Sequence, residues 1–156
     1  MSVALFTVHV LGIAGTIGAV ATLGYLISFR TYGTWLHGRA EGSVDSDHNV
    51  PGTPYLPADA AQEARAAKLL KCPPIVLDAQ RRFVVDATVQ GVCDYRRWTL
   101  HAVHVRTTHV HVVITARHTP ERVMTDLKGW ATRRMRESGV LGADVEPWAY
   151  HGSTRY

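Results

Sequence analysis

The sequence has few cysteines and no spacing typical of a metal-binding finger. Cys72 and Cys93 are its only thiols, and neither belongs to a CxxC pair or to a Cys/His finger pattern. A disulfide-stapled scaffold and a zinc finger are therefore excluded, and reduced, buried thiols in a cytoplasmic protein are favoured. Internal repeats and low-complexity tracts are also missing. With 156 residues, the chain is long enough for one domain with a substantial core.

Charged side chains are missing from the beginning of the chain. Residues 2–29 contain no Asp, Glu, Lys or Arg, a length that suffices for a membrane-spanning helix. A positively charged leader is missing too, which argues against a secretory signal. Because a strand pattern starts near Leu23, we expect an apolar extension over residues 1–22 and a domain over residues 23–156. The extension is a membrane anchor, a segment packed on the domain, or residues upstream of the true start; the last is favoured.

Acidic side chains are outnumbered in most of the chain. Residues 1–63 hold two basic and five acidic residues, a charge of −3, whereas the remainder holds 15 basic and eight acidic residues, a charge of +7. A basic segment of this kind favours a polyanionic partner, nucleic acid above all. The alternative is a solvated arginine face without a partner.

The first half of the domain is expected to contain one strand and two helices. Residues 25–31 read as a strand, residues 32–38 as a glycine-punctuated turn, and residues 39–57 as a long irregular loop. An alanine-rich helix is predicted over residues 58–70, before two prolines. Asp78 is expected to cap a second helix that ends near Arg96, with a buried side made of Phe83, Val85, Val89, Val92 and Cys93.

The second half is expected to contain a hairpin, a helix and an edge strand. Residues 98–106 and 107–114 are predicted to pair as two strands, and Thr119 with Pro120 starts a helix that ends before Gly139. Its core stripe is Val123, Leu127, Trp130, Ala131 and Met135. Residues 145–150 are predicted to form a last edge strand. This order indicates an α+β sandwich of the ferredoxin-like kind, an antiparallel sheet with helices on one face.

The second strand of the hairpin carries two histidines two residues apart. Successive side chains of a strand point to opposite faces, so His109, His111 and Val113 share one face, and the apolar residues between them share the other. Two imidazoles in this position hold one divalent metal if a third ligand arrives from elsewhere. The alternative is a pair of solvated or packed histidines.

Several stretches resemble one family of DNA-processing proteins. They are YLISFRTYGTWLHG over residues 25–38, LHAVH over 100–104 and HVHVVI over 109–114, followed by the helix 120–138 and WAYHGSTRY over 148–156. Together they resemble the HUH-type transposases with a single catalytic tyrosine, closest to the REP-associated tyrosine transposase branch. HUH denotes two histidines that flank a hydrophobic residue, here Val110.

The resemblance implies cleavage and rejoining of single-stranded or hairpin DNA. His109 and His111 would hold Mg²⁺ or Mn²⁺, which polarises the scissile phosphate, and a tyrosine would attack it to form a 5′-phosphotyrosine. The expected DNA-binding residues are basic side chains and aromatic side chains that stack on unpaired bases, namely Arg30, Tyr32, Trp35, Arg106, Lys128, Arg133 and Arg134. For Trp35 the alternative is core packing.

The chain departs from the family pattern in the helix that carries the nucleophile. That helix should follow the last strand, with a further metal ligand, often Gln, one turn beyond the tyrosine. Tyr150 and Tyr156 are the only tyrosines after the HUH motif, and the glutamines all lie upstream of it. We therefore expect a truncated copy with impaired catalysis, in which Tyr156 is the candidate nucleophile.

The family also implies a homodimer, whose partner chain would be able to supply the helix, and a nucleoid-associated cytoplasmic location. Two other classes stay open. One is a non-catalytic single-stranded nucleic-acid-binding module on a ferredoxin-like sheet. The other is a membrane-anchored protein of unknown role.

Overall fold

A computed structural model describes residues 24–39 and 57–155 of the chain. The predicted extension over residues 1–22, most of the predicted loop over 39–57, and Tyr156 lie outside the described residues. The elements follow in the order β1 (Gly24–Thr31), α1 (Ala60–Lys68), α2 (Ala79–Arg96), β2 (Thr99–Val105), β3 (His109–Thr115), α3 (Pro120–Glu137) and β4 (Trp148–Arg155).

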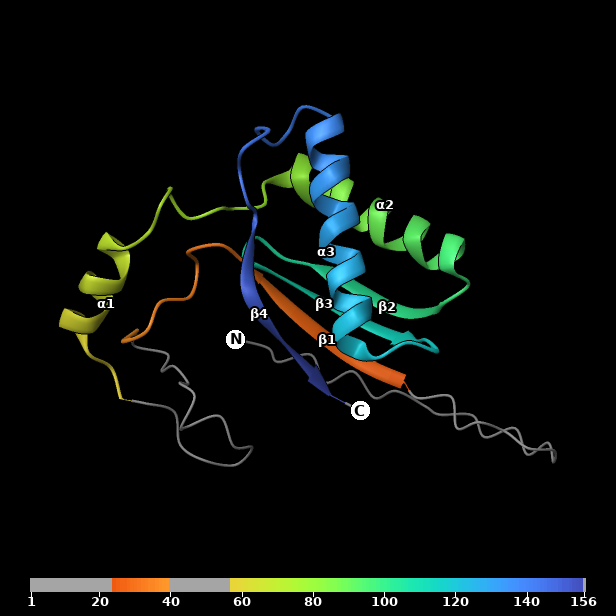
Figure 1. Ribbon diagram of the computed structural model, residues 1–156, viewed down its shortest axis with the longest axis horizontal. Helices are drawn as coiled ribbons and strands as arrows, with labels where there is room; N and C mark the ends of the chain where they lie inside the picture. The colour runs from red at the N-terminus through yellow and green to blue at the C-terminus, as the bar shows by residue number, and fades with distance from the viewer. Residues whose placement is uncertain (1–23, 40–56, 156) are drawn as a thin grey trace.

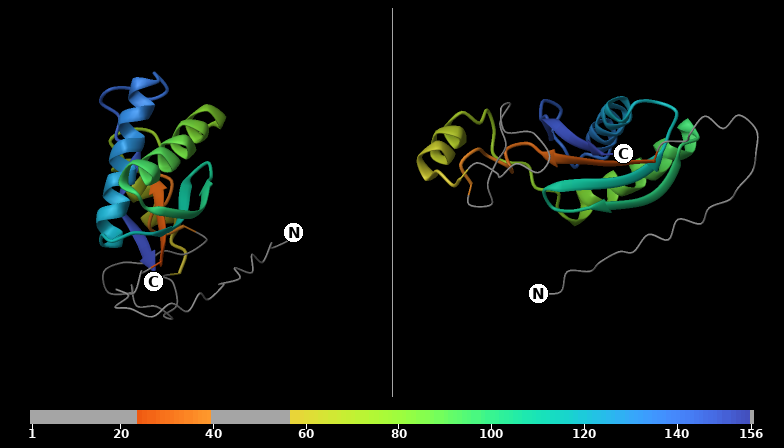
Figure 2. Two further views of the ribbon diagram at one scale, coloured as in Figure 1. Left: turned by 90° about the vertical axis from the view of Figure 1, so that its right-hand side faces the viewer. Right: turned by 90° about the horizontal axis from the view of Figure 1, so that it is seen from below.

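The four strands form one antiparallel sheet in the order β2-β3-β1-β4. With α2 and α3 as the two crossovers, this is the ferredoxin-like arrangement, so the α+β prediction is confirmed. Figure 1 shows α3 lying across the sheet with α2 beside it, and Figure 2 shows the same layers from two other sides. None of the described helices packs on the opposite side of the sheet, the side that carries His109 and His111, and we call this side the open face. The short helix α1 lies apart from the sheet in Figure 1 and has no buried residue.

Local sequence signals explain where the two packed helices begin and end. A side-chain oxygen of Asp78 accepts a hydrogen bond from the backbone N–H of Arg81 at 2.8 Å, and Arg97 ends α2 in the left-handed conformation with φ 56°. Thr119 caps α3 ahead of Pro120 at the first position, and Gly139 follows the helix with φ 72°. These starts and stops are the ones predicted from sequence.

The core lies between the helices and the inner face of the sheet. Its fully buried apolar side chains come from the two central strands, from both helices and from the segment just before α2: Ile27, Phe29, Leu77, Val85, Val89, Val110, Val112, Ile114, Val123, Leu127, Ala131 and Met135. Burying one such aliphatic side chain stabilises the fold by about 1.5–3 kcal/mol. The core therefore holds β1 and β3, the two central strands, in a fixed register.

Two sequence expectations need correction. Phe83 is 74% exposed rather than buried. The buried positions of α2 follow a spacing of three and four residues from Val85, and Phe83, two residues earlier, points the other way. The last edge strand runs over 148–155 rather than 145–150, and a shift of register between Phe29 and Thr31 inserts extra β4 residues opposite β1.

Candidate metal and nucleic-acid site

The two histidines of β3 lie on the open face, as the alternation of the strand predicts. His109 and His111 are half-buried, whereas Val110, Val112 and Ile114 between and beyond them are fully buried in the core. The two imidazole rings lie 4.8 Å apart between centroids and are tilted by 68°. We call these two residues the histidine pair. Because β3 is a central strand, the backbone that carries the pair is fixed on both sides.

Each ring of the histidine pair has a hydroxyl partner at its Nδ1 atom. Ser28 Oγ lies 2.6 Å from His111 Nδ1, and Thr108 Oγ1 lies 3.1 Å from His109 Nδ1. In the tautomer that carries the proton on Nδ1, each ring donates to its hydroxyl and keeps the Nε2 lone pair for another ligand. Hydroxyls in this position fix the orientation of both rings, as the outer partners of metal-binding histidines do.

The strand register places basic and polar side chains on both sides of the histidine pair. On β1, Arg30 pairs with His109 and Ser28 with His111. On β2, His104 pairs with His111, and the backbone N–H of Arg106 donates to the His109 carbonyl at 2.8 Å, which continues the ladder by one residue. Paired residues of antiparallel strands share a face. His109 is therefore flanked by two arginines, one on each neighbouring strand.

Acidic side chains are missing from the sheet. None of the strands β1 to β4 contains Asp or Glu. The pKa of both members of the histidine pair is lowered, first by burial and then by neighbouring positive groups, which for both rings include Arg30, Arg106 and His104. A lowered pKa favours the neutral form of both rings at neutral pH, and the neutral form is the one that binds a metal.

The donor set fits a borderline divalent cation better than a hard one. Two neutral imidazoles suit Mn²⁺ or a later transition metal, whereas Mg²⁺ prefers oxygen ligands and keeps its waters. Among residues 24–39 and 57–155, no group of three or more His, Cys, Asp or Glu side chains is arranged to hold a metal ion. The described residues thus offer two ligands, and a complete site needs a further donor from another source.

An aromatic ring with two arginines extends this region beyond the end of β1. The Arg30 guanidinium lies 4.0 Å from the centre of the Trp35 ring, and that of Arg39 lies 5.9 Å from it. Trp35 is 37% exposed and is not part of the core, so the structure does not support core packing for this side chain. Tyr32 has a structural contact, because its hydroxyl accepts a hydrogen bond from the Lys71 backbone N–H at 2.8 Å.

The three predicted DNA-binding residues of α3 lie on the helix layer, away from the open face. The Lys128 ammonium donates to the carbonyl of Ala149 at 2.9 Å and also contacts the two carbonyls that follow it in β4 at 3.4 Å. Arg133 stacks on Trp130 at 4.7 Å, and Arg134 pairs with Glu137 at 2.8 Å. The structure therefore does not bring these side chains together with the histidine pair.

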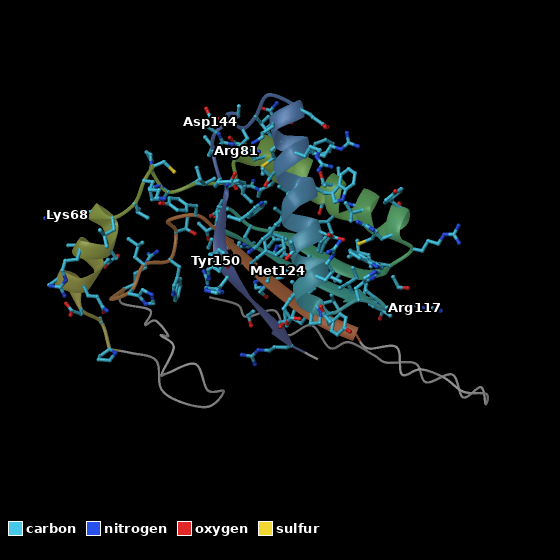
Figure 3. All side chains as sticks on the ribbon, viewed as in Figure 1. Lys68, Arg81, Arg117, Met124, Asp144 and Tyr150 are labelled. Atoms are coloured by element: carbon cyan, nitrogen blue, oxygen red, sulfur yellow. The ribbon has the colours of Figure 1, made fainter. Side chains whose placement is uncertain are left out.

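The next question is where the described tyrosines lie relative to the histidine pair. Tyr25 is buried in the core and Tyr95 is an exposed residue of α2. Tyr150, labelled in Figure 3, belongs to β4. Its side chain is 92% exposed. The ring of Tyr150 packs on that of His151, 4.7 Å away. Tyr156, the predicted nucleophile, lies outside the described residues.

Sequence reasoning did not identify Ser28 or His104 as site residues. Nothing in a single strand marks them, because their place beside His111 follows from pairing with β3. For Ser28 the available signal was alternation, because Ser28 and Arg30 are the polar residues of β1 between buried Ile27, Phe29 and Thr31. For His104 it was the stretch LHAVH over residues 100–104.

Comparison with protein-family models and with curated proteins found no match. Among solved structures, the chain is similar to the 1.90 Å crystal structure of a "putative transposase" from Deinococcus radiodurans R1. The two are 15% identical with a TM-score of 0.56, and the alignment covers 92% of this chain and 85% of that one. At this identity the likeness shows the fold. The two chains therefore share an overall fold.

The membrane prediction concerned residues that the structure leaves undescribed. Within the described ranges, none of the helices combines the length and the apolar character that crossing a bilayer requires.

Proposed function

We propose that this chain is a metal-dependent single-stranded DNA-binding protein of the HUH tyrosine type, related in activity to DNA transposases. One observation carries the proposal. The histidine pair has both Nδ1 atoms bound to hydroxyls and is flanked by arginines on the two neighbouring strands, on a sheet without acidic residues. The transposase-like fold and the motifs HVHVVI and YLISFRTYGTWLHG support the same proposal.

The open face has the chemistry that a DNA backbone requires. Neighbouring strands lie about 4.7–4.9 Å apart, so Arg106, His109 and Arg30 form a short line across the sheet. One guanidinium group binds two phosphate oxygens at once through parallel N–H donors. In this proposal the two arginines hold the DNA backbone on either side of the metal. Trp35, beside Arg30, offers a ring on which an unpaired base stacks.

His109 and His111 would hold the cation through Nε2, with Mn²⁺ preferred to Mg²⁺ by the donor set. A bound cation supplies Lewis-acid polarisation of the scissile phosphate. In cleavage, a tyrosine oxygen bonds to phosphorus while the bond from phosphorus to the 3′-oxygen breaks, which leaves a 5′-phosphotyrosine and a 3′-hydroxyl. Tyr156 of the same chain, or a tyrosine of a second copy in a homodimer, is the proposed nucleophile.

The test incubates the protein with Mn²⁺ and a labelled single-stranded hairpin oligonucleotide and looks for a covalent adduct on a denaturing gel. An adduct that disappears in Tyr156→Phe and in His109→Ala supports the whole proposal. Mn²⁺-dependent binding without an adduct contradicts cleavage by Tyr156 and retains the binding part. The absence of DNA binding contradicts the proposal altogether.

A second candidate function is a non-catalytic single-stranded nucleic-acid-binding module. It is favoured by the surroundings of the described tyrosines, of which Tyr25 is buried and Tyr95 belongs to the helix layer. The two functions differ in what the histidine pair does. A binding module keeps its DNA affinity when both histidines are replaced by Gln, whereas the metal-dependent function loses the part of its affinity that Mn²⁺ provides.

A further inference from the structure

A third histidine faces the site from the neighbouring strand. His104 lies in β2 directly opposite His111, so its side chain shares the open face with the histidine pair. It is exposed, whereas both members of the pair are half-buried. His104 is also among the positive groups that lower the pKa of His109 and His111, which agrees with its closeness to both.

His104 differs from the other imidazoles of this face in its hydrogen bonds. His109 and His111 bond to Thr108 and Ser28, and His101 Nε2 lies 2.9 Å from Thr115 Oγ1. By contrast, the His104 ring has no hydrogen bond to any of the described residues. Both of its nitrogens are thus available to a ligand that lies on the sheet.

The geometry does not make His104 a third metal ligand. Within the described part of the chain, no three potential ligands are arranged around one point, although His104 belongs to the same row as His111. An imidazole in either neutral tautomer carries one N–H donor and is able to bond a phosphate oxygen without a charge of its own. Arg106, two residues further on, supplies a cation on the same side of the histidine pair.

We propose that His104 forms a phosphate subsite on the β2 side of the histidine pair, where its N–H donates to a non-bridging oxygen of the DNA backbone. This inference rests on the proposed function, because it assumes that single-stranded DNA crosses the open face. It assigns His109 and His111 to the metal, and His104 to the DNA alone. Arg106 neutralises the charge of the same stretch of backbone.

The test measures fluorescence anisotropy of a labelled single-stranded oligonucleotide with the full chain, in EDTA and in Mn²⁺. His104→Ala should weaken DNA binding about tenfold in both conditions, the loss expected for one hydrogen bond to a charged acceptor. His104→Gln, whose amide N–H replaces the ring donor, should restore most of that loss. Mn²⁺ affinity without DNA should be unchanged in both variants, because His104 is assigned to the DNA and not to the metal.

His118→Ala is the matched control, because His118 is an exposed histidine that follows β3 and packs edge-on against the Trp98 ring, 5.8 Å away between ring centroids. It should leave DNA affinity unchanged. Thermal unfolding followed by circular dichroism checks that the variants fold.

The alternatives give different results. Loss of Mn²⁺ affinity in His104→Ala would make His104 a metal ligand and overturn the inference. Unchanged DNA affinity in His104→Ala, or failure of Gln to restore it, would overturn it as well. Absence of DNA binding by the wild-type chain refutes the proposed function itself, and with it this inference.

Discussion

Removing one hydroxyl from β1 should weaken metal binding at a residue that is not itself a ligand. Ser28 Oγ lies 2.6 Å from His111 Nδ1, which restricts the rotation of the ring and leaves Nε2 for another ligand. In Ser28→Ala the ring loses this partner and rotates more freely. Substitutions at such supporting residues typically cost between tenfold and a hundredfold in metal affinity. We expect about tenfold weaker Mn²⁺ binding, equivalent to about 1.4 kcal/mol.

The expected effect on folding is smaller than the effect on the metal. A hydrogen bond between neutral groups contributes about 0.5–1.5 kcal/mol to stability, and both partners of this one are half-buried rather than fully buried. The free energy of unfolding in urea should therefore fall by no more than about 1 kcal/mol. Isothermal titration calorimetry, or loss of the free-Mn²⁺ paramagnetic resonance signal, gives the affinity.

Ser153→Ala is the matched control. Ser153 lies directly opposite Ser28 on β4, so the same atom is deleted from the next strand at the same level of the sheet. Because Ser153 is exposed and has no bond to His111, its loss should leave Mn²⁺ affinity within twofold. Equal Mn²⁺ binding by wild type and Ser28→Ala, or an equal loss in both serine variants, would refute the reasoning.

Three further predictions concern pH, thiol chemistry and glycine. Because the pKa of each member of the histidine pair is lowered, protons compete with Mn²⁺ only at a pH below the usual value of 6.5, so Mn²⁺ affinity should stay constant to below pH 6.5 before it falls. The unfolded chain takes up these protons first, so the free energy of unfolding in urea should decrease below pH 6.5. The decrease should be larger in wild type than in a variant with Gln at both positions. Burial, aided by the neighbouring carboxylate, raises the pKa of Cys93 to about 11, so Ellman's reagent at pH 8 should titrate Cys72 first and Cys93 only on unfolding; rapid modification of both thiols would contradict this. A Cβ atom at Gly152 would meet Met124 Sδ and a carbonyl of β1, so Gly152→Ala should destabilise by about 1–3 kcal/mol, whereas Gly129→Ala on α3, with open space around it, should stabilise by about 0.5–1 kcal/mol in urea unfolding.

The part of the fold that sequence predicts is the part that local rules decide. Alternation alone separates Val110 and Val112 from the histidine pair, because a strand has only two faces. Asp78 and Thr119 predict the starts of two helices because a capping side chain needs only its own first turn. The order of such elements was sufficient for the ferredoxin-like class.

The surroundings of the site depended on pairing, which the sequence does not display. Ser28 and His111 are separated by 83 positions along the chain and meet only because β1 pairs with β3 in one register. A slip of one residue would turn Ser28 and Arg30 to the core face. Arg30 and Arg106 were selected for their charge, and their places on either side of His109 could be seen only in the sheet.

Lys128 was predicted from its charge to bind DNA, but its ammonium is occupied within the fold. Sequence marks it as a cation available to DNA, yet the carbonyls of β4 that approach its ammonium are brought there by the irregular pairing of β4 with β1. A net-charge count treats a basic side chain that faces solvent and one that is bonded to backbone carbonyls in the same way. Charge counts thus overestimate the surface offered to a polyanion.

The contact between Lys128 and β4 has a consequence for how copies of this chain meet. A strand at the edge of a sheet exposes a row of carbonyl and amide groups that another chain is able to pair with. Lys128 binds the carbonyls of Ala149, Tyr150 and His151 from within the same molecule, so these acceptors are turned away from a visiting strand. Within β4, residues 152–155 keep regular pairing with β1, a stretch too short for extended pairing with another chain. The Lys128 ammonium therefore protects the β4 edge of the sheet against edge-to-edge association.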